Sequence, residues 1–289
     1  MRLGVSDDWF PGGFNAIDDR LAAVIAGMGF TATVGHFQGD PTAPDALLVC
    51  QRVKHVLDAH GLALVQFWGS YPSLLSPDED VRGAAVRGCQ AIVRLAARLG
   101  ADMACLRPTS LHPTHPWWAH ADNFLPETRA RLVRGLTEIM PVAEAEGIPV
   151  ALECHVTTTL SSPEIVREII EEVGSPWLKV NMDVVNFISS LHEAYHSAEV
   201  INRAFDALGA YAVAAHLKDV VVDEGHVVHI SEAIPGDGLF DWDTFFRHFE
   251  ALLPDGYGFI EHLKSEEQVR RANAFIRGKL AELDIPVRQ

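Results

Sequence analysis

The segment Ala151–Leu152–Glu153–Cys154–His155 joins a short apolar run to a carboxylate and an imidazole. Three later segments repeat this form, each with an apolar run that ends in a residue able to bind a metal. They are 178–183, 213–216 and 258–261, which end in Asp183, His216 and Glu261. If the four runs are neighbouring parallel strands, their ends meet at one edge of the sheet and build a single site.

Short β-rich runs alternate with longer helical patterns along the whole chain. We expect strands at 3–7, 31–36, 62–68, 102–107, 149–153, 178–183, 211–216 and 257–261. We expect helices at 15–28, 44–60, 78–99, 126–146, 163–173, 198–208, 242–253 and 265–283. Eight strands alternating with eight helices in 289 residues predict an α/β fold, a single-domain (β/α)8 TIM barrel over residues 1–289.

Two details of this fold prediction are less regular. A hairpin-like insertion is expected at 220–230, between the seventh strand and a Pro-Gly-Asp-Gly turn. A doubly wound open sheet is the alternative architecture, and it normally carries a glycine-rich first turn. Residues 6–9 contain no G-x-G-x-x-G motif, so the barrel is favoured.

The composition limits the partners of the protein. Hydrophobic residues make up 48% of the chain, but no run is long and apolar enough to cross a membrane. The first seven residues already contain charged side chains and four cysteines lie far apart, so we expect a cytoplasmic protein with reduced thiols. The formal net charge of −16 disfavours both nucleic acid and anionic membranes as partners.

The four strand-end residues form a hard, mostly oxygen ligand set of three carboxylates and one imidazole: Glu153, Asp183, His216 and Glu261. This set suits Mn²⁺ or Mg²⁺, with Co²⁺ or Zn²⁺ as alternatives. Such an ion would acidify the C–H next to a bound carbonyl and hold the enediolate that results. Each residue could instead be an ordinary charged strand end, but the recurrence on four consecutive strands favours a metal site.

Two further motifs accompany the order Glu, Asp, His, Glu: His216–Leu217–Lys218–Asp219 and Pro235–Gly236–Asp237–Gly238–Leu239–Phe240–Asp241–Trp242. With these motifs the chain resembles, over nearly its whole length, the xylose-isomerase-like TIM-barrel superfamily of sugar (phosphate) isomerases and epimerases. The resemblance implies that the four residues hold Mn²⁺ or a similar ion. In the ketose 3-epimerase branch it also implies that Glu153 and Glu261 move the proton between the two faces of the sugar.

The chain departs from the ketose 3-epimerase branch at two positions. Asn186 stands where that branch has a substrate-binding histidine, and Val222 stands where it has an arginine. The segment 183–187 looks more like branches that act on oxo-sugars and sugar acids. Those branches include decarboxylases and C-glycoside-cleaving lyases.

Two residues are expected to join the metal ligands in catalysis. His155 and Lys218 each follow a predicted ligand by two positions, so on a strand they face the same side and point into the barrel mouth. His155 would bind substrate or shuttle a proton, with a packed histidine as the alternative. Lys218 would bind a substrate oxygen or an anion, with an ordinary salt bridge as the alternative.

Other polar and aromatic residues at the mouth are candidates for substrate binding: Arg107, His36, Trp68, His115, Asn186 and His229. Arg107 ends the fourth strand, and its guanidinium fork fits a carboxylate. His115 belongs to the loop 108–124, which is rich in proline, histidine and tryptophan and is either a lid or a proline-stiffened surface loop. His229 and Glu232 are expected to flank the mouth after the hairpin.

Four functions compete at this stage. The first is a metal-dependent isomerase or epimerase of a keto-sugar or sugar acid. The second is a lyase, either a decarboxylase or a C-glycoside-cleaving enzyme, that acts on a 3-oxo sugar derivative through the same enolate. The third is a DNA-repair enzyme like endonuclease IV, which the acidic net charge disfavours, and the fourth is a non-catalytic sugar-binding barrel.

The substrate is expected to be a small sugar or sugar acid without a phosphate group. The glycine-rich turn after the seventh strand contains Asp237, and the next helix begins with Asp241 and Asp243, whose charges would repel phosphate. A homo-oligomer is one expected state of the protein, because barrels of this family often pair through their rims.

Overall fold

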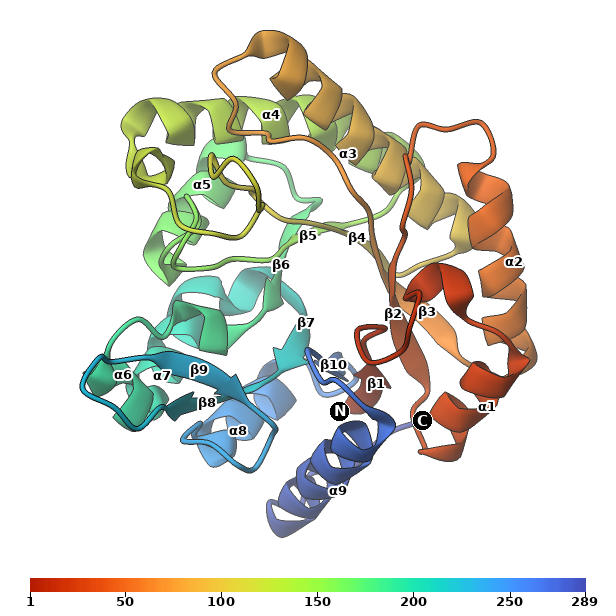
Figure 1. Ribbon diagram of the computed structural model, residues 1–289, viewed down its shortest axis with the longest axis vertical. Coiled ribbons are helices and arrows are strands. Elements are labelled where there is room, and N and C mark those ends of the chain that lie inside the picture. The colour runs from red at the N-terminus through yellow and green to blue at the C-terminus, as the bar shows by residue number, and fades with distance from the viewer.

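The computed structural model describes residues 1–289 and contains one closed barrel of eight parallel strands surrounded by helices (Figure 1). The barrel strands are β1 (Arg2–Val5), β2 (Ala32–His36), β3 (Ala63–Trp68), β4 (Met103–Leu106), β5 (Val150–Leu152), β6 (Leu178–Met182), β7 (Ala212–Leu217) and β10 (Tyr257–Ile260). Consecutive strands pair with one another, and β10 closes the barrel against β1. This arrangement confirms the (β/α)8 barrel and excludes the open sheet.

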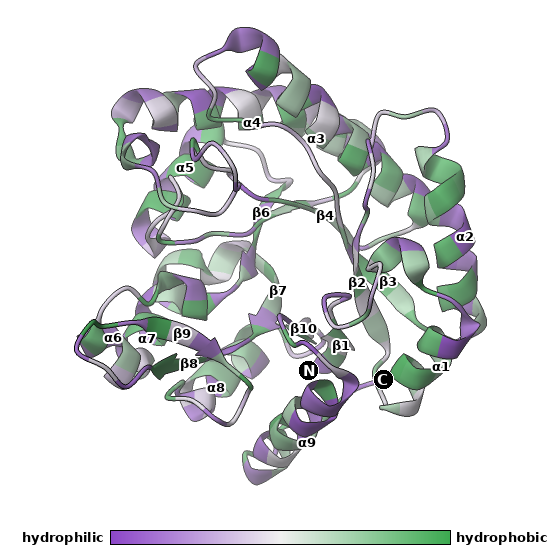
Figure 2. Cartoon of the chain, in the orientation of Figure 1, coloured by the Kyte–Doolittle hydropathy of each residue, from purple (hydrophilic) through white to green (hydrophobic).

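A ring of helices covers the outside of the barrel: α1 (Asp19–Gly27), α2 (Ala46–Ala59), α3 (Glu79–Leu99), α4 (Pro126–Glu146), α5 (Pro163–Val173), α7 (Ser197–Leu208), α8 (Trp242–Leu252) and α9 (Glu266–Glu282). Hydrophobic and hydrophilic residues alternate along these helices, as expected for helices with one buried face (Figure 2). No helix is both long and apolar enough to span a membrane. All four cysteines are buried and unpaired, as their spacing predicted.

The local sequence explains where several helices begin and end. The Ser162 hydroxyl accepts a hydrogen bond from the backbone N–H of Ile165 and so caps the start of α5, whose first residue is Pro163. Helix α4 ends at Gly147, whose φ of 67° is a left-handed conformation that glycine adopts without a steric penalty. The first helix begins later than predicted, because Asp18 caps it at Asp19 and residues 14–16 form a separate 3₁₀ turn.

Other boundaries also differ from the sequence-based prediction. Five barrel strands, β1, β4, β5, β6 and β10, end one or two residues early, where the backbone turns into the loops of the barrel mouth. A short helix α6 (Leu191–Tyr195) precedes α7 and was not predicted. The hairpin is larger than expected, because its strands β8 (Asp219–Val222) and β9 (Ile230–Ala233) pair antiparallel beyond both ends of 220–230.

The barrel interior is a separate core of ten buried residues: Ala32, Val34, Val65, Trp68, Met103, Cys105, Ala151, Ala214, Tyr257 and Phe259. Phe259 stacks on Tyr257 with ring centroids 5.7 Å apart. A side chain at Gly4, on the neighbouring strand β1, would overlap the Phe259 ring. The barrel therefore closes tightly here because a glycine lies beside the Phe259 ring.

Replacing Phe259 with alanine should lower the free energy of unfolding by about 3–5 kcal/mol, because it opens a cavity in a fully buried interior. Urea unfolding followed by far-UV circular dichroism would measure the change. The matched control is Phe124→Ala, since Phe124 is 54% exposed and should change stability by less than about 0.5 kcal/mol. Equal losses in both variants would contradict this account of the interior.

Candidate active site

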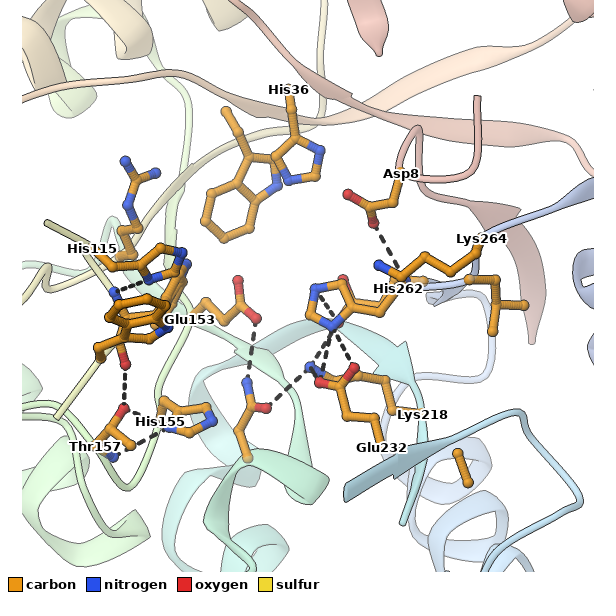
Figure 3. A pocket seen from close by; sticks show the side chains of 18 of the residues that line it. Asp8, His36, His115, Glu153, His155, Thr157, Lys218, Glu232, His262 and Lys264 are labelled. Carbon is orange, nitrogen blue, oxygen red and sulfur yellow. Dashed lines mark hydrogen bonds and ion pairs between the residues drawn. The ribbon is translucent and has the colours of Figure 1, made fainter. Parts of the chain in front are cut away.

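A cavity of about 900 Å³ opens at the carboxyl ends of the barrel strands, where (β/α)8 enzymes carry their active sites. Figure 3 shows that its lining is mainly polar and aromatic and includes Glu153, His155, Lys218 and His262. The cavity is large enough for a substrate bigger than a single sugar ring, because pockets for drug-sized ligands span about 300–1,000 Å³.

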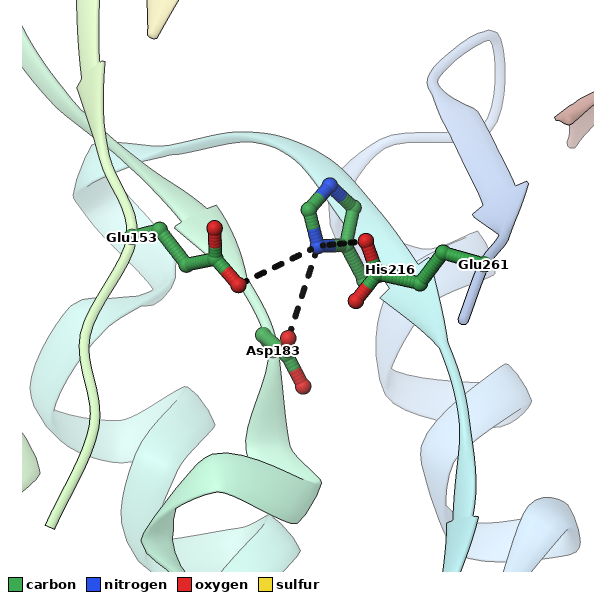
Figure 4. Close-up of side chains that lie close together, drawn as sticks. All are labelled: Glu153, Asp183, His216 and Glu261. Carbon is green, nitrogen blue, oxygen red and sulfur yellow. Dashed lines mark ion pairs between the residues drawn. The ribbon is translucent and has the colours of Figure 1, made fainter. Parts of the chain in front are cut away.

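The four predicted metal ligands lie together at the base of this cavity (Figure 4). Glu153 follows β5, Asp183 follows β6, His216 lies in β7 and Glu261 follows β10. All four are buried, and their candidate ligand atoms lie within 4.8 Å of one another. His216 Nδ1 is 2.9 Å from Glu261 Oε2, 3.4 Å from Asp183 Oδ2 and 3.7 Å from Glu153 Oε1.

The hydrogen bond on the far side of His216 decides which ring nitrogen faces the carboxylates. Nε2 of His216 lies 3.0 Å from the side-chain oxygen of Gln66, which can only accept a hydrogen bond. The Gln66 amide group donates to Asn181 Oδ1 at 2.9 Å, which fixes the orientation of Gln66. The proton of a neutral His216 therefore sits on Nε2, and Nδ1 presents a lone pair to the three carboxylates.

The cluster strongly favours an added positive charge. Burial opposes the charged form of His216, but Glu261 and the other two carboxylates raise its pKa well above the ordinary value. With His216 neutral, two buried polar atoms of the cluster have no hydrogen-bond partner, Asp183 Oδ1 and His216 Nδ1. Buried polar atoms are normally paired, so these residues fit a bound divalent cation that would take the place of the extra proton.

Lys218 and Asn186 complete the floor of the cavity. Lys218 Nζ is 2.6 Å from Asp183 Oδ2 and 2.9 Å from Glu261 Oε1. It also donates a hydrogen bond to Asn186 Oδ1 at 3.0 Å, while the Asn186 amide donates to Asp183 and to Glu153. With His216 neutral, three carboxylates and one ammonium leave a net charge of −2, which a divalent ion would neutralise.

A second group of charges, which the sequence analysis largely missed, lies above the floor. Both carboxylate oxygens of Glu232 are 2.9 Å from His262 Nδ1. Attraction to Glu261 raises the pKa of His262 to about 9, although burial opposes the charged form of this ring. Burial also opposes ionisation of Glu232, but the hydrogen bond to His262 helps lower the pKa of Glu232 to about 2. Asp8 accepts a hydrogen bond from the backbone N–H of His262 at 3.3 Å. The only sequence signal for His262 was its position directly after a predicted ligand.

His155 lies in the cavity wall, as its position two residues after Glu153 predicted. Its Nδ1 is 3.2 Å from the backbone N–H of Thr157 and 2.8 Å from the Thr157 hydroxyl. Burial and the nearby Lys218 charge lower the pKa of His155 to about 4. The ring is therefore neutral at pH 7, and because Nδ1 accepts from Thr157, the proton is on Nε2.

Most of the predicted substrate-binding residues line the cavity, namely Arg107, His36, Trp68, His115 and Asn186. Arg107 packs on the Tyr71 ring, 4.9 Å from its centroid, and forms no ion pair with a carboxylate. His115 stacks on Trp118 with centroids 4.8 Å apart. His229 is an exception, because it lies on the exposed turn before β9, outside the cavity wall, and its predicted substrate contact has no support in this arrangement.

The loop 108–124 is tied to the barrel by its own hydrogen bonds. Buried Asn123 accepts from the backbone N–H of Leu111 and donates to Ser110 Oγ and to the Thr157 carbonyl. The Thr157 hydroxyl in turn donates to the Trp117 carbonyl. The loop thus holds Trp117 and His115 in the cavity wall as a built part of the site.

The turn after the hairpin is closed around a buried carboxylate. Asp219 accepts hydrogen bonds from the backbone N–H groups of Val220 at 2.8 Å, Gly236 at 2.9 Å and Phe240 at 3.0 Å, and from the Trp242 indole at 3.1 Å. A side chain at Gly238 would overlap Asp219. The amides of this turn that could have bound a phosphate are therefore used inside the protein, a stronger reason than the one the sequence offered.

Comparison with known proteins agrees with this geometry. Residues 22–279 match the family model of the xylose isomerase-like TIM barrel, and the chain belongs to that family. Inosose dehydratase from Glaesserella parasuis is 26% identical over 251 residues, which are 77% of this chain and 76% of that protein. A C-glycoside deglycosidase alpha subunit from Microbacterium trichothecenolyticum is 39% identical over 83 residues, which cover only 25% of this chain and 23% of that protein.

Solved structures show the same fold at low sequence identity. A D-tagatose 3-epimerase-like protein superimposes with a TM-score of 0.74 at 19% identity, covering 98% of both chains. A xylose isomerase-like barrel from Mycobacterium smegmatis, determined in complex with magnesium, also gives 0.74, at 16% identity over 98% of this chain and 97% of that one. The buried Glu, Asp and His cluster of the present chain is likewise able to bind a divalent metal.

Replacing Asp219 with asparagine should lower the free energy of unfolding by about 2–4 kcal/mol, because an amide group would face donors that now share a buried carboxylate. Urea unfolding would measure the loss. Asp237→Asn is the matched control in the same turn, since Asp237 is exposed and pairs only with Arg271 on the surface. If both variants were equally stable, Asp219 would not be what holds the turn.

Proposed function

We propose that this protein is a divalent-metal-dependent lyase that acts on an unphosphorylated keto-sugar, keto-sugar acid or keto-cyclitol. A base removes the proton from the carbon next to the carbonyl, the bond to a substituent on the following carbon breaks, and the substrate gains a double bond. The observation that carries this proposal is the buried cluster of three carboxylates and His216 Nδ1 at the base of a cavity of about 900 Å³.

The residues proposed to hold the metal are Glu153, Asp183, His216 and Glu261, and Mn²⁺ or Mg²⁺ suits their oxygen-rich set. A divalent ion bound there would polarise the substrate carbonyl. Co²⁺ and Zn²⁺ remain alternatives, because imidazole and carboxylate ligands accept them too.

The proton-removing base is Glu153 or Glu261. Both carboxylates line the cavity, and they follow β5 and β10, the first and the last of the four strands that supply the predicted ligands. Burial opposes ionisation of Glu261, yet His216 and Lys218 hold its pKa well below the ordinary value, so the carboxylate is ionised at pH 7. Lys218 and neutral His155 are placed to donate hydrogen bonds to substrate oxygens. Arg107, a cavity cation without a carboxylate partner, is placed to bind a carboxylate or hydroxyl group of the substrate.

Bond cleavage is favoured over simple proton transfer by the nature of the sequence relatives. The matched proteins are a dehydratase and a deglycosidase, and both names describe the breaking of a bond. The volume of the cavity also leaves room for a substituent that departs from the sugar ring.

An isomerase or epimerase of the same substrate class is the second candidate. Two carboxylates that flank the ligand cluster, Glu153 and Glu261, are what a proton transfer between two faces of a sugar requires. The similar fold of a D-tagatose 3-epimerase-like protein is consistent with this outcome. A function on DNA is not proposed, because the net charge of −16 opposes a nucleic-acid partner.

Metal binding can be tested with chelator-treated protein and isothermal titration of Mn²⁺. One ion should bind per chain, and Asp183→Asn should weaken binding by more than about 100-fold, because losing even a residue that only supports a ligand costs about 10–100-fold. Asp58→Asn, which changes an exposed carboxylate on α2, should bind like the unaltered protein. Undiminished binding by Asp183→Asn would refute the proposed ligand set.

The reaction can be tested in D₂O with Mn²⁺-loaded protein and a panel of keto-sugars, 3-oxo-glucosides and inososes, followed by NMR. We expect deuterium to enter next to the carbonyl and the substituent to be released. Glu153→Gln or Glu261→Gln should lower the rate about 10²–10⁴-fold, the usual contribution of a general base.

The outcome of the same experiment separates the candidate functions. Deuterated epimer without release of a substituent would establish the second candidate in place of the lyase. If both glutamine variants released the substituent as fast as the unaltered protein does, the assignment of the base would be contradicted.

A further inference from the structure

Across the barrel from the predicted metal ligands, the buried carboxylate of Asp7 holds His36 at the cavity wall. The ligands follow or lie in four neighbouring strands, β5, β6, β7 and β10, whereas Asp7 follows β1 and His36 ends β2. In the order of strands around the barrel, β2 lies opposite β6, the strand that carries Asp183. Figure 3 shows His36 on the side of the cavity opposite Lys218 and Glu232.

The contacts between Asp7 and His36 fix the ring in one orientation. Asp7 Oδ1 forms a short hydrogen bond with His36 Nδ1. Asp7 Oδ2 accepts from the backbone N–H groups of Phe14 at 2.7 Å and of His36 itself at 3.1 Å. The ring lies on Trp68, its pairing neighbour on β3, with centroids 5.5 Å apart.

This arrangement leaves one ring nitrogen of His36 free to bind a ligand. Nδ1 is used by Asp7, so Nε2 is the ring nitrogen available to the cavity that His36 lines. Asp7 is only 2% exposed, and burying a carboxylate is costly unless it is paired. A histidine that only packed on Trp68 would not need a buried anion behind it.

We propose that His36 is the general acid of the reaction, with Asp7 as the positioning residue that orients its ring and supports its charge. This inference rests on the proposed lyase function. The carboxylate of Glu153 or Glu261 takes the proton next to the carbonyl, and the bond to the leaving oxygen breaks with its electron pair. His36 Nε2 gives its proton to that oxygen, so the products are an unsaturated ketone and water or an alcohol.

The charges around His36 suit this role. Those that act on the ring are Asp7, Asp8 and Glu261, all carboxylates from the two neighbouring strand ends. Although burial opposes the charged form, Asp7 above all raises the pKa of His36 to about 9. His36 therefore carries its proton at pH 7, whereas His155 at the other wall is neutral there.

The test compares two 3-oxo-glucosides that differ only in the leaving group, a methyl and a 4-nitrophenyl glycoside. Mn²⁺-loaded protein and His36→Gln are followed in D₂O for exchange of the proton at C2 and for release of the alcohol. We expect His36→Gln to keep proton exchange within about threefold but to release methanol about 10²–10⁴-fold more slowly. Release of 4-nitrophenol should change less than about tenfold, because this leaving group departs without a proton.

Two controls separate an acid from a structural residue. His60→Gln changes a half-buried histidine at the end of α2 that contacts Asp19 and does not line the cavity, so it should match the unaltered protein in both assays. In Asp7→Asn the His36 ring, followed by NMR, should titrate at least one pH unit lower than in the unaltered protein. Methanol release by Asp7→Asn should accordingly fall at a lower pH, while Mn²⁺ binding is retained.

Each outcome decides between the two proposals. Unaltered methanol release by His36→Gln would overturn the general acid and leave the lyase standing. Equal loss of exchange and release for both glycosides would also overturn it, since His36 would then only position the substrate. If the unaltered protein neither exchanges the proton nor releases either alcohol, the lyase function falls and this inference falls with it.

Discussion

The burial of three carboxylates beside one another is the constraint on which the site depends. Glu153, Asp183 and Glu261 are each 7% exposed or less, and like charges at such distances repel strongly in a medium of low polarity. Lys218 offsets one of these charges, and His216 turns a ring nitrogen toward all three. Further positive charge, from a proton on His216 or from a bound divalent ion, would therefore stabilise the arrangement.

This constraint divides the barrel mouth into two unlike halves. The strands from β5 to β10 carry the anionic cluster, while the strands from β1 to β4 contribute Arg107, Trp68 and the protonated His36. A substrate between them would meet a proton acceptor on one side and a proton donor on the other. The closed barrel makes this possible, because it brings the first and last strands of the chain into one rim.

The fold and the clustering of the four predicted metal ligands could be predicted from sequence because their signals are local. Each ligand follows an apolar run directly, as Glu153 does, and the strands are marked by composition alone. Contacts between separate loops gave no such signal: the Asp7–His36 pair spans 29 positions and the Glu232–His262 pair spans 30. The sequence also did not indicate that His229 lies on the exposed turn of the hairpin, because the pairing of β8 with β9 decides which residues face the mouth.

The carboxylate of Asp219 has a consequence for the evolution of specificity. The turn would need its amides to hold a substrate phosphate, yet the same amides keep the turn folded through this side chain. Recognition of a phosphorylated sugar and stability of the turn are thus in competition for the same donors. A descendant of this chain could acquire phosphate binding at this turn only by passing through a less stable intermediate, so no single substitution here would add it without a loss of stability.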